Sequence, residues 1–175
     1  MKTLLLMRHG KSDWGADYQA DHERPLNERG VRSSRLMGRL LAGRKMAPQH
    51  VISSSALRAR TTAELAIEAG GWDCPLVLDT GLYGSGVAGV LAIAAAAPDV
   101  ARLAIIGHQP TWSMTVGEIV GSRVEMKTAS VAVVELTIDS WSELPDAGGS
   151  LIDLINPRTF FGSKWDQDRQ QGHGG

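Results

Sequence analysis

Short apolar runs alternate along this chain with longer segments in which apolar residues recur at helical spacing. Four runs are expected to be strands. Residues 3–7 look like a buried strand, 51–52 start a short strand that stops at 53–55, and 75–78 and 102–106 are expected to be the third and fourth. A helix is expected after each run, over about 27–41, 56–69, 87–97 and 110–120. Two further β segments, 131–138 and 150–155, are expected to be joined by a turn through 145–149.

Residues suited to helix ends support these boundaries. Asn27 can act as an N-cap, and Gly43 can end the helix that follows it. Gly70 and Gly71 can close the second helix, and Pro110 suits the first turn of the fourth. The repeated alternation of strand and helix predicts an α/β domain with a largely parallel sheet. In such sheets, ligands gather at the carboxyl ends of the strands.

Guanidinium and imidazole side chains occur at these strand ends. The first run ends in Arg8 and His9, Arg58 lies in the opening turn of the helix after the second run, and the fourth run leads into His108. All four are expected to converge on one edge of the sheet. Arginine offers a planar fork of donors that matches phosphate oxygens, and a neutral imidazole carries a lone pair that can attack phosphorus. The pattern indicates a phosphate pocket with a built-in nucleophile.

Composition narrows the possible partners and location. The 175 residues suit one domain, predicted over residues 1–165, followed by a polar, glycine-rich tail at 166–175 that is expected to be disordered. A net charge of −1 and few aromatic residues argue against nucleic-acid and anionic-membrane partners. The single cysteine, Cys74, excludes an intramolecular disulfide. No apolar run approaches the ~20 residues of a membrane helix, and residues 4–7 are too few for a signal peptide, so a cytoplasmic protein is expected.

Three motifs in this order resemble those of the histidine phosphatase superfamily. Residues 7–12, Met-Arg-His-Gly-Lys-Ser, look like its Arg-His-Gly signature, and residues 54–62 resemble its second motif of a Ser, then Arg-Ala, then Thr. Residues 106–110, Ile-Gly-His-Gln-Pro, resemble the third motif, Gly-His before a helix. Within the superfamily, Asp21 with Arg24-Pro-Leu and Gly30 is similar to the small bacterial phosphohistidine phosphatases.

The resemblance implies a fold and a set of roles. The fold would be a three-layer α/β/α sandwich of the phosphoglycerate mutase type, with a largely parallel central sheet. His9 would attack phosphorus to form a phosphohistidine intermediate, and Arg8, Arg58 and His108 would hold the phosphoryl oxygens. Neither a metal nor a cofactor is implied. The remaining candidates for phosphate contacts are the side chain of Ser12 and the backbone N–H of Gln109.

The chain departs from the superfamily pattern at two places. Gly15 stands where many members carry an Asn, and residues 80–85 lack the Glu that protonates the leaving group in many members. An alkoxide gains much from such an acid, whereas the imidazole of a phosphohistidine can depart protonated and neutral. The departure favours a P–N substrate. It leaves open that Asp13, Asp79 or a carboxylate of residues 10–26 supplies a proton.

Other features of the sequence allow further interpretations. His9 and His108 alone make a weak zinc site, since no supporting ligand has the usual spacing. Residues 84–89 match G-x-G-x-x-G, but the acidic residue that a dinucleotide site needs on the next strand is missing. Trp14 is a candidate for either the pocket entrance or the core. Further histidines lack such motifs and are expected to be solvated: His22, His50 and His173. Five basic residues are candidates for the rim of the pocket: Lys11, Arg24, Arg32, Arg35 and Arg39. For the last three of these, a solvated helix face is favoured.

The sequence therefore predicts a metal-independent phosphatase that acts on phosphorylated protein, with protein phosphohistidine preferred. A small-molecule phosphomonoesterase of the sugar phosphate type is the main alternative, and a mutase is less favoured because a short chain offers few residues to enclose a substrate with two phosphates. A non-catalytic module that binds phosphoproteins is a third alternative, although binding alone would not need His9.

Overall fold

The computed structural model describes residues 1–161, and its centre is one six-stranded sheet. The strands are β1 (Lys2–Arg8), β2 (His50–Ser54), β3 (Leu76–Asp79), β4 (Arg102–Gly107), β5 (Val131–Leu136) and β6 (Gly149–Ile155). Their order across the sheet is β3-β2-β4-β1-β5-β6. The predicted end of the domain at residue 165 and the predicted tail at 166–175 lie outside the described residues.

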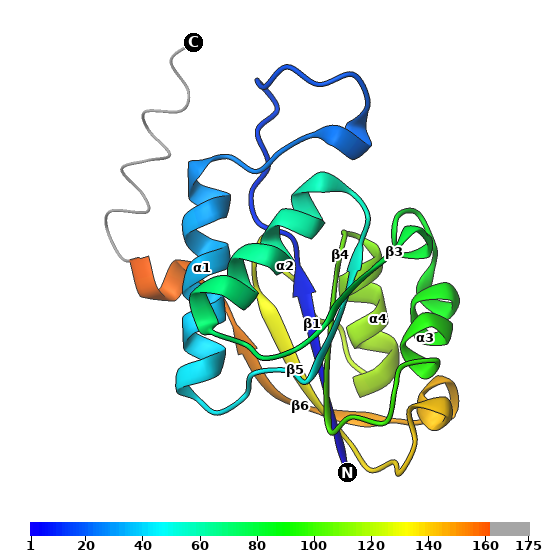
Figure 1. Ribbon diagram of the computed structural model, residues 1–175. Coiled ribbons are helices and arrows are strands. Elements are labelled where there is room, and N and C mark those ends of the chain that lie inside the picture. The colour runs from blue at the N-terminus through cyan, green and yellow to red at the C-terminus, as the bar shows by residue number, and fades with distance from the viewer. Residues whose placement is uncertain (162–175) are drawn as a thin grey trace.

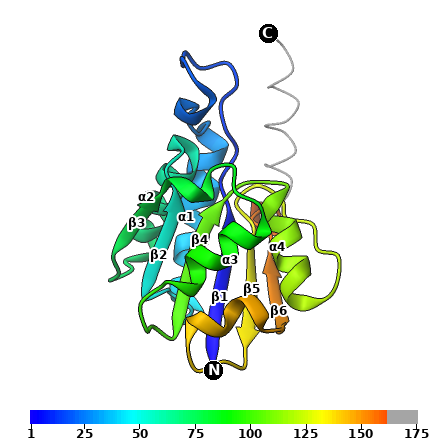
Figure 2. The ribbon, with the colours of Figure 1, turned by 90° about the vertical axis from the view of Figure 1, so that its right-hand side faces the viewer.

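Helices cover both faces of the sheet, which makes three layers (Figures 1 and 2). The helices are α1 (Glu28–Gly43), α2 (Leu57–Gly70), α3 (Val87–Ala95) and α4 (Thr111–Val120). One apolar core lies between α1, α2 and the sheet, and includes Leu5 and Met7 of β1. The other lies between α3, α4 and the opposite face, and includes Leu4 and Leu6 of the same strand. Alternate residues of β1 thus enter opposite cores, as strand geometry requires.

The sheet is parallel on one side and antiparallel on the other. The strand pairs β1–β4, β2–β4 and β2–β3 are parallel, whereas β1–β5 and β5–β6 are antiparallel. The predicted three-layer α/β/α sandwich with a largely parallel sheet is confirmed. Between β5 and β6, however, the chain forms a six-residue 3-10 helix, Trp141–Asp146, rather than only a turn. The side chains of Trp141 and Leu144 are buried in the core against α3, which explains why this segment is ordered.

Glycines bring the end of β1 into close contact with the start of α1. A Cβ at Gly30 would lie 2.2 Å from the carbonyl oxygen of Lys11, and one at Gly10 would lie 2.8 Å from the carbonyl oxygen of Gly30. The side chain of Asn27 accepts a hydrogen bond from the Gly30 N–H at 2.8 Å, so the predicted N-cap is confirmed. Gly71, in the left-handed conformation with φ of 60°, ends α2. These contacts fix the position of the residues that follow β1.

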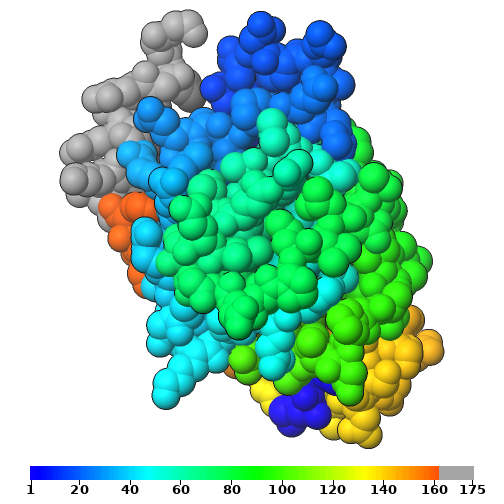
Figure 3. Space-filling view, viewed as in Figure 1, coloured from blue at the N-terminus to red at the C-terminus, as the bar shows by residue number. Residues whose placement is uncertain are grey.

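Residues 10–26 form a loop above the carboxyl ends of the parallel strands (Figure 1), and this loop protrudes from the surface of the molecule (Figure 3). Its two ends are joined by hydrogen bonds from the Asp13 N–H to the Pro25 carbonyl oxygen, 2.8 Å, and from the Asn27 N–H to the Lys11 carbonyl oxygen, 3.0 Å. The short 3-10 helix Asp21–Glu23 lies within it. The loop therefore overhangs the edge of the sheet where ligands are expected. None of the helices within residues 1–161 is long and apolar enough to cross a membrane.

Candidate active site

The structure brings the four predicted catalytic residues to one cavity. Arg8 is the last residue of β1, His9 follows it, Arg58 lies in the first turn of α2, and His108 follows β4. All four line a cavity of about 410 Å³. The ring centroids of His9 and His108 are 5.1 Å apart. The prediction that these side chains converge at the carboxyl ends of the strands is confirmed, and their roles in catalysis stay a prediction.

His9 is held in a defined tautomer. Its Nδ1 lies 2.6 Å from the carbonyl oxygen of Gly10, which can only accept, so Nδ1 carries the proton and Nε2 carries the lone pair. The backbone is fixed as well, because the His9 N–H donates to Gly107 and the His9 carbonyl accepts from Ala129, both at 3.0 Å. Burial lowers the pKa of His9 to about 3, and the charges of Arg58 and Arg8 act in the same direction while the Gly10 carbonyl opposes them. The ring is therefore neutral near pH 7, as a nucleophile requires.

His108 is oriented by β2. Its Nε2 lies 2.8 Å from the hydroxyl oxygen of Ser54, and its buried Nδ1 has no hydrogen-bond partner among the residues described. A hydroxyl can donate or accept, so the contact with Ser54 is compatible with the proton of the neutral ring on Nδ1 or on Nε2. Burial and then the charge of Arg58 lower the pKa of His108 to about 4. Gly107 precedes it because a Cβ there would lie 2.1 Å from the ring of Trp112.

Arg58 is anchored to the overhanging loop through Asp21. Its Nη1 donates to the Asp21 backbone carbonyl at 2.7 Å, and its Nη2 forms an ion pair with the Asp21 carboxylate at 3.0 Å. The same carboxylate accepts hydrogen bonds from Arg24 and from the Tyr83 hydroxyl, both at 2.9 Å. Burial raises the pKa of Asp21, but the bonds from Tyr83 and Arg24 and the nearby arginine charges outweigh it and lower the pKa to about 2. Asp21 is therefore an ionised anchor at neutral pH and not a proton donor.

Arg8 and Arg58 both keep donor capacity for a ligand. Arg8 donates from Nη1 to the Met126 carbonyl oxygen at 3.0 Å. The Nε atoms of Arg8 and Arg58 are buried without a hydrogen-bond partner in the part of the chain that the structure describes. Buried donors that lack an acceptor are costly, and such groups are found at functional sites.

The two secondary candidates also line the cavity. Ser12 is buried, and its hydroxyl accepts a hydrogen bond from Arg24. The side chain of Gln109 binds Ser113, which leaves its backbone N–H as the predicted phosphate donor. Trp14 lies at the entrance with 71% of its surface exposed, and its ring lies 3.5 Å from the guanidinium carbon of Arg24. The sequence allows Trp14 to lie either at the pocket entrance or in the core, and the entrance is correct.

The sequence did not reveal the contacts between the loop and residues around the cavity. His22 was expected to be solvated, but it is half-buried, its Nε2 lies 2.9 Å from the Ser55 hydroxyl, and its ring makes an edge contact with Tyr83. Tyr83 in turn makes an edge contact with His108. Neither residue belongs to a recognisable motif, so only the folded loop shows that they border the site. His50 is half-buried at the start of β2, and His173 lies outside the described residues.

No Asp or Glu lines this cavity within residues 1–161. Asp13 accepts a hydrogen bond from the Gly15 N–H, and Asp79 accepts one from the Gly81 N–H, so both cap local turns. Nor does the described part of the chain group three or more His, Cys, Asp or Glu residues so that they could hold a metal ion. The lining is instead rich in arginine and histidine.

This fold with two arginines and two histidines at the ends of its strands defines the histidine phosphatase class. Residues 4–84 match the model of the histidine phosphatase superfamily, branch 1. An uncharacterized protein of Mycobacterium tuberculosis is 32% identical over 164 residues, which cover 87% of this chain and all of that protein. The chain belongs to the histidine phosphatase superfamily.

Solved structures agree with this assignment. A SixA structure from Nakamurella multipartitia is 31% identical, with a TM-score of 0.78, and the match covers 89% of this chain and 96% of that one. A structure of the protein histidine phosphatase SixA complexed with tungstate is 26% identical, with a TM-score of 0.78, and covers 90% of this chain and 99% of that one. The chain is thus similar to phosphohistidine phosphatases over nearly its whole length.

Proposed function

We propose that this protein is a phosphatase that transfers a phosphoryl group to Nε2 of His9 and then to water, and that protein phosphohistidine is its preferred substrate. One observation carries the proposal. His9 is a neutral imidazole with its proton fixed on Nδ1 by Gly10, in a cavity lined by arginines. A nucleophile in that state, beside preorganised cations, is suited to in-line attack on a phosphoryl group.

In the first step, the Nε2 lone pair of His9 forms a bond to phosphorus while the bond from phosphorus to the leaving group breaks. Charge spreads over the three equatorial oxygens, which Arg8, Arg58 and His108 are placed to stabilise. The leaving group takes the electron pair of the broken bond; an imidazole that already carries a proton on its other ring nitrogen thereby departs neutral. On the enzyme, the Nδ1–H of the phosphorylated ring continues to donate to Gly10, which stabilises the positive charge of that ring.

In the second step, water attacks phosphorus, the P–Nε2 bond breaks, and its electron pair returns to Nε2. The products are orthophosphate, a proton and neutral His9. The low pKa of His9 supports this step, because a weakly basic imidazole is a good leaving group.

The preference for a P–N bond is supported by the lining of the cavity. Because the described lining has no carboxylate, it offers no obvious general acid for an alkoxide. An imidazole leaving group can be protonated on its other nitrogen before it departs, and therefore needs less help. The SixA structure complexed with tungstate, which is an oxyanion, supports an oxyanion as a ligand of this protein. The absence of any cofactor or metal requirement and the cytoplasmic location stay predictions.

The proposal is tested by incubating the protein with phosphoramidate, with a histidine-phosphorylated protein and with p-nitrophenyl phosphate, each with and without EDTA. Mass spectrometry at neutral to alkaline pH, where phosphohistidine survives, should find a single added phosphoryl group on His9 after rapid quenching. His9→Gln should abolish both turnover and labelling. The matched control is His50→Gln, a half-buried histidine on β2 that does not line the cavity, which should retain both.

Each outcome distinguishes the alternatives. Hydrolysis of the P–N substrates that EDTA does not reduce supports the proposal. Faster turnover of p-nitrophenyl phosphate than of either P–N substrate would instead favour a phosphomonoesterase. Binding of phosphate without any turnover would favour a module that only binds phosphoproteins.

A further inference from the structure

The entrance of the candidate active site carries an exposed aromatic side chain. Apart from His9 and His108, Trp14 provides the only aromatic ring that lines this cavity within residues 1–161. The two ends of the cavity differ in exposure, since Trp14 is 71% exposed whereas His9 is 8% exposed. Tryptophan offers a large, flat apolar face that stacks on other rings. Trp14 therefore presents such a face at the point where a ligand enters.

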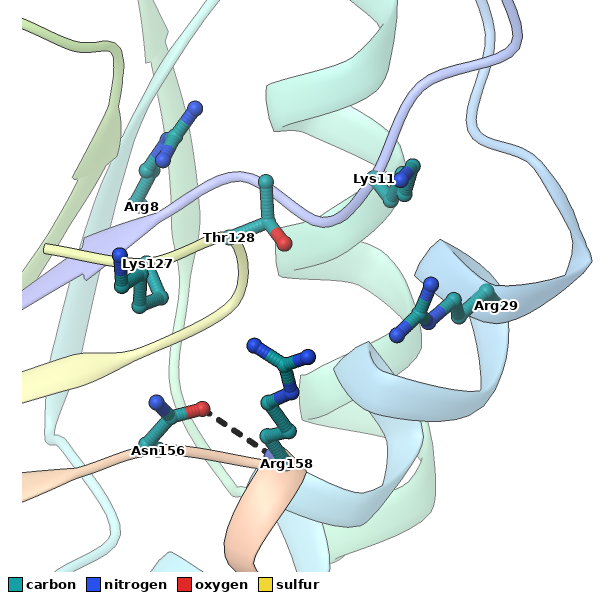
Figure 4. Close-up of a pocket in the computed structure, with 7 residues that line it drawn as sticks. All are labelled: Arg8, Lys11, Arg29, Lys127, Thr128, Asn156 and Arg158. Atoms are coloured by element: carbon teal, nitrogen blue, oxygen red, sulfur yellow. Dashed lines mark hydrogen bonds between the residues drawn. The ribbon is translucent and has the colours of Figure 1, made fainter. Parts of the chain in front are cut away.

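Another side of the site is polar. A second, smaller cavity of about 200 Å³ adjoins the site there and shares Arg8, Lys11 and Thr128 with it (Figure 4). In the described part of the chain, every residue that lines this smaller cavity is charged or polar. A flat apolar ring that enters the site therefore finds a matching surface at Trp14 and not at the smaller cavity.

The turn that carries Trp14 is held in place. At the base of the loop, the Asp13 N–H donates to the Pro25 carbonyl oxygen at 2.8 Å. The Asp13 carboxylate accepts a hydrogen bond from the Gly15 N–H at 3.0 Å, which closes the turn around Trp14. The indole ring lies on Arg24, with 3.5 Å between the ring centroid and the guanidinium carbon. At this distance the guanidinium is in stacking contact with the indole face.

Arg24 is itself fixed on all sides. It is buried, its Nε and Nη2 donate to the Asp21 carboxylate at 3.3 and 2.9 Å, and its Nη1 donates to the Ser12 hydroxyl. All three nitrogen atoms of the guanidinium are thus engaged. Trp14 rests on an immobile support, so little conformational entropy is lost when a ligand stacks on its ring.

The geometry of the proposed reaction determines what comes beside Trp14. In an in-line displacement, the nucleophile and the leaving group lie on opposite sides of phosphorus. His9 is buried directly after β1, so the leaving group points away from the sheet and toward the entrance. In a phosphoprotein, the phosphoryl group must reach His9 while the backbone of the substrate stays outside. The leaving group therefore occupies the entrance, where Trp14 lies.

We propose that Trp14 stacks on the leaving group of the substrate while His9 attacks the phosphoryl group, so that the site selects a flat aromatic leaving group. The inference rests on the proposed function and adds to it the class of leaving group. The imidazole of phosphohistidine fits this class, and when protonated it is also attracted by the indole face as a cation. The stack forms when the substrate binds and persists during the reaction, so it strengthens binding more than it lowers the barrier.

The kinetic test compares phosphoimidazole, which releases imidazole, with phosphoramidate, which releases ammonia. The ratio of their kcat/KM values cancels the contacts of the phosphoryl group, which both substrates share. Trp14→Leu should lower this ratio about five- to tenfold relative to the wild-type protein, as expected for one aromatic stacking contact. The loss should consist mainly of a higher KM for phosphoimidazole. Trp14→Phe keeps an aromatic face and should keep the ratio within about twofold.

The matched control is Phe160→Leu. Phe160 is exposed, its ring also lies near an arginine, Arg44 at 5.9 Å, and it lines neither of the two cavities described above. This substitution should leave the ratio and the basal activity unchanged. Calorimetry with phenylphosphonate and methylphosphonate, whose P–C bonds are not hydrolysed, provides a binding readout that needs no turnover. Phenylphosphonate should bind about five- to tenfold more tightly, and Trp14→Leu should remove that advantage.

The outcomes separate this inference from the proposed function. If neither P–N substrate is hydrolysed, the proposed function fails, and the calorimetry still decides whether Trp14 binds a ring: equal affinities for the two phosphonates would overturn the inference. If both substrates are hydrolysed but Trp14→Leu reduces their kcat/KM values equally, Trp14 acts only through Arg24 and the inference is overturned. A ratio that falls as far in Phe160→Leu as in Trp14→Leu would also overturn it.

Discussion

Asp21→Asn is the substitution that best tests how the overhanging loop acts on the chemistry. The change keeps the size of the side chain and removes its charge. It affects the ion pair with Arg58 but leaves the bond from Arg58 Nη1 to the Asp21 backbone carbonyl in place. Asp21 does not line the cavity, so the effect must pass through the position of the two arginines that it pairs with and that do line it, Arg58 and Arg24.

The size of the effect follows from the geometry. A hydrogen bond to a charged group contributes about 1.5–3 kcal/mol. The Asp21 side chain is 47% exposed, so solvent screening places its contribution at or below the lower end of that range. A loss of about 1.4 kcal/mol corresponds to a tenfold change. We expect kcat with phosphoramidate to fall about tenfold, well short of the 10²–10³-fold loss that removing a preorganised charge such as Arg58 typically causes.

The assay measures kcat together with inhibition by orthophosphate. Losing a negative charge near the cavity makes the site more positive, so the inhibition constant for orthophosphate should stay the same or decrease. A fall in kcat without weaker phosphate binding is the expected signature of a positioning residue. Glu64→Gln, which breaks an exposed ion pair with Arg60 on α2, is the matched control and should change neither quantity. An unchanged kcat for Asp21→Asn, or phosphate binding weakened in proportion to kcat, would refute the reasoning.

Three further predictions concern the first strand and its neighbours. His9→Ala should remove turnover while the protein still unfolds cooperatively on heating. Its Tm should fall by a few degrees because the hydrogen bond to Gly10 is lost. Loss of the cooperative transition would contradict the position of His9 at the rim of the sheet. Because the pKa of His9 is lowered from 6.5 to about 3, its ring signals in NMR should not titrate between pH 8 and 5. The stability that comes from keeping this ring neutral is complete above about pH 6.5 and should be lost as the pH falls toward 3. A titration midpoint near 6.5 in the folded protein would be inconsistent with the burial of His9. Gly30→Ala should lower the free energy of unfolding by about 1–3 kcal/mol, seen as a fall in Tm, because its Cβ would lie 2.2 Å from the Lys11 oxygen. Gly43→Ala on the same helix meets nothing within 4 Å and should not be destabilising, so equal losses in the two variants would rule out the close approach as the cause.

Much of the fold and the central part of the site could be predicted because they depend on local signals and one general rule. The Asn27 cap and the left-handed Gly71 depend on a few adjacent residues, and α1 begins and α2 ends where these residues predict. The rule that parallel strands deliver their carboxyl ends to one edge then brought His9 and His108 together, although 98 residues separate them in the sequence.

The parts that could not be predicted depend on how irregular segments return to the sheet. The contact of Asp21 with Arg58 and Tyr83 requires the loop to fold over the strand ends, and no periodic pattern encodes that path. Arg158 and Arg29 line one small cavity only because β6 pairs antiparallel with β5, which returns the end of the described chain to the start of α1. The solvated state expected for His22 was wrong for the same reason, since its partner Ser55 lies 33 residues away.

The position of β1 in the interior of the sheet determines which parts of this protein can be altered without disturbing His9. His9 follows a strand that is hydrogen-bonded to β4 on one side and β5 on the other, whereas residues 10–26 and the turn after β6 lie outside the ladder. Backbone amides near His9 should therefore exchange slowly with solvent, and those of the overhanging loop should exchange quickly. His9 and the irregular segments that border the cavity are thus mechanically separate parts, so residues 10–26 can be rebuilt while the strand that leads into His9 is left intact.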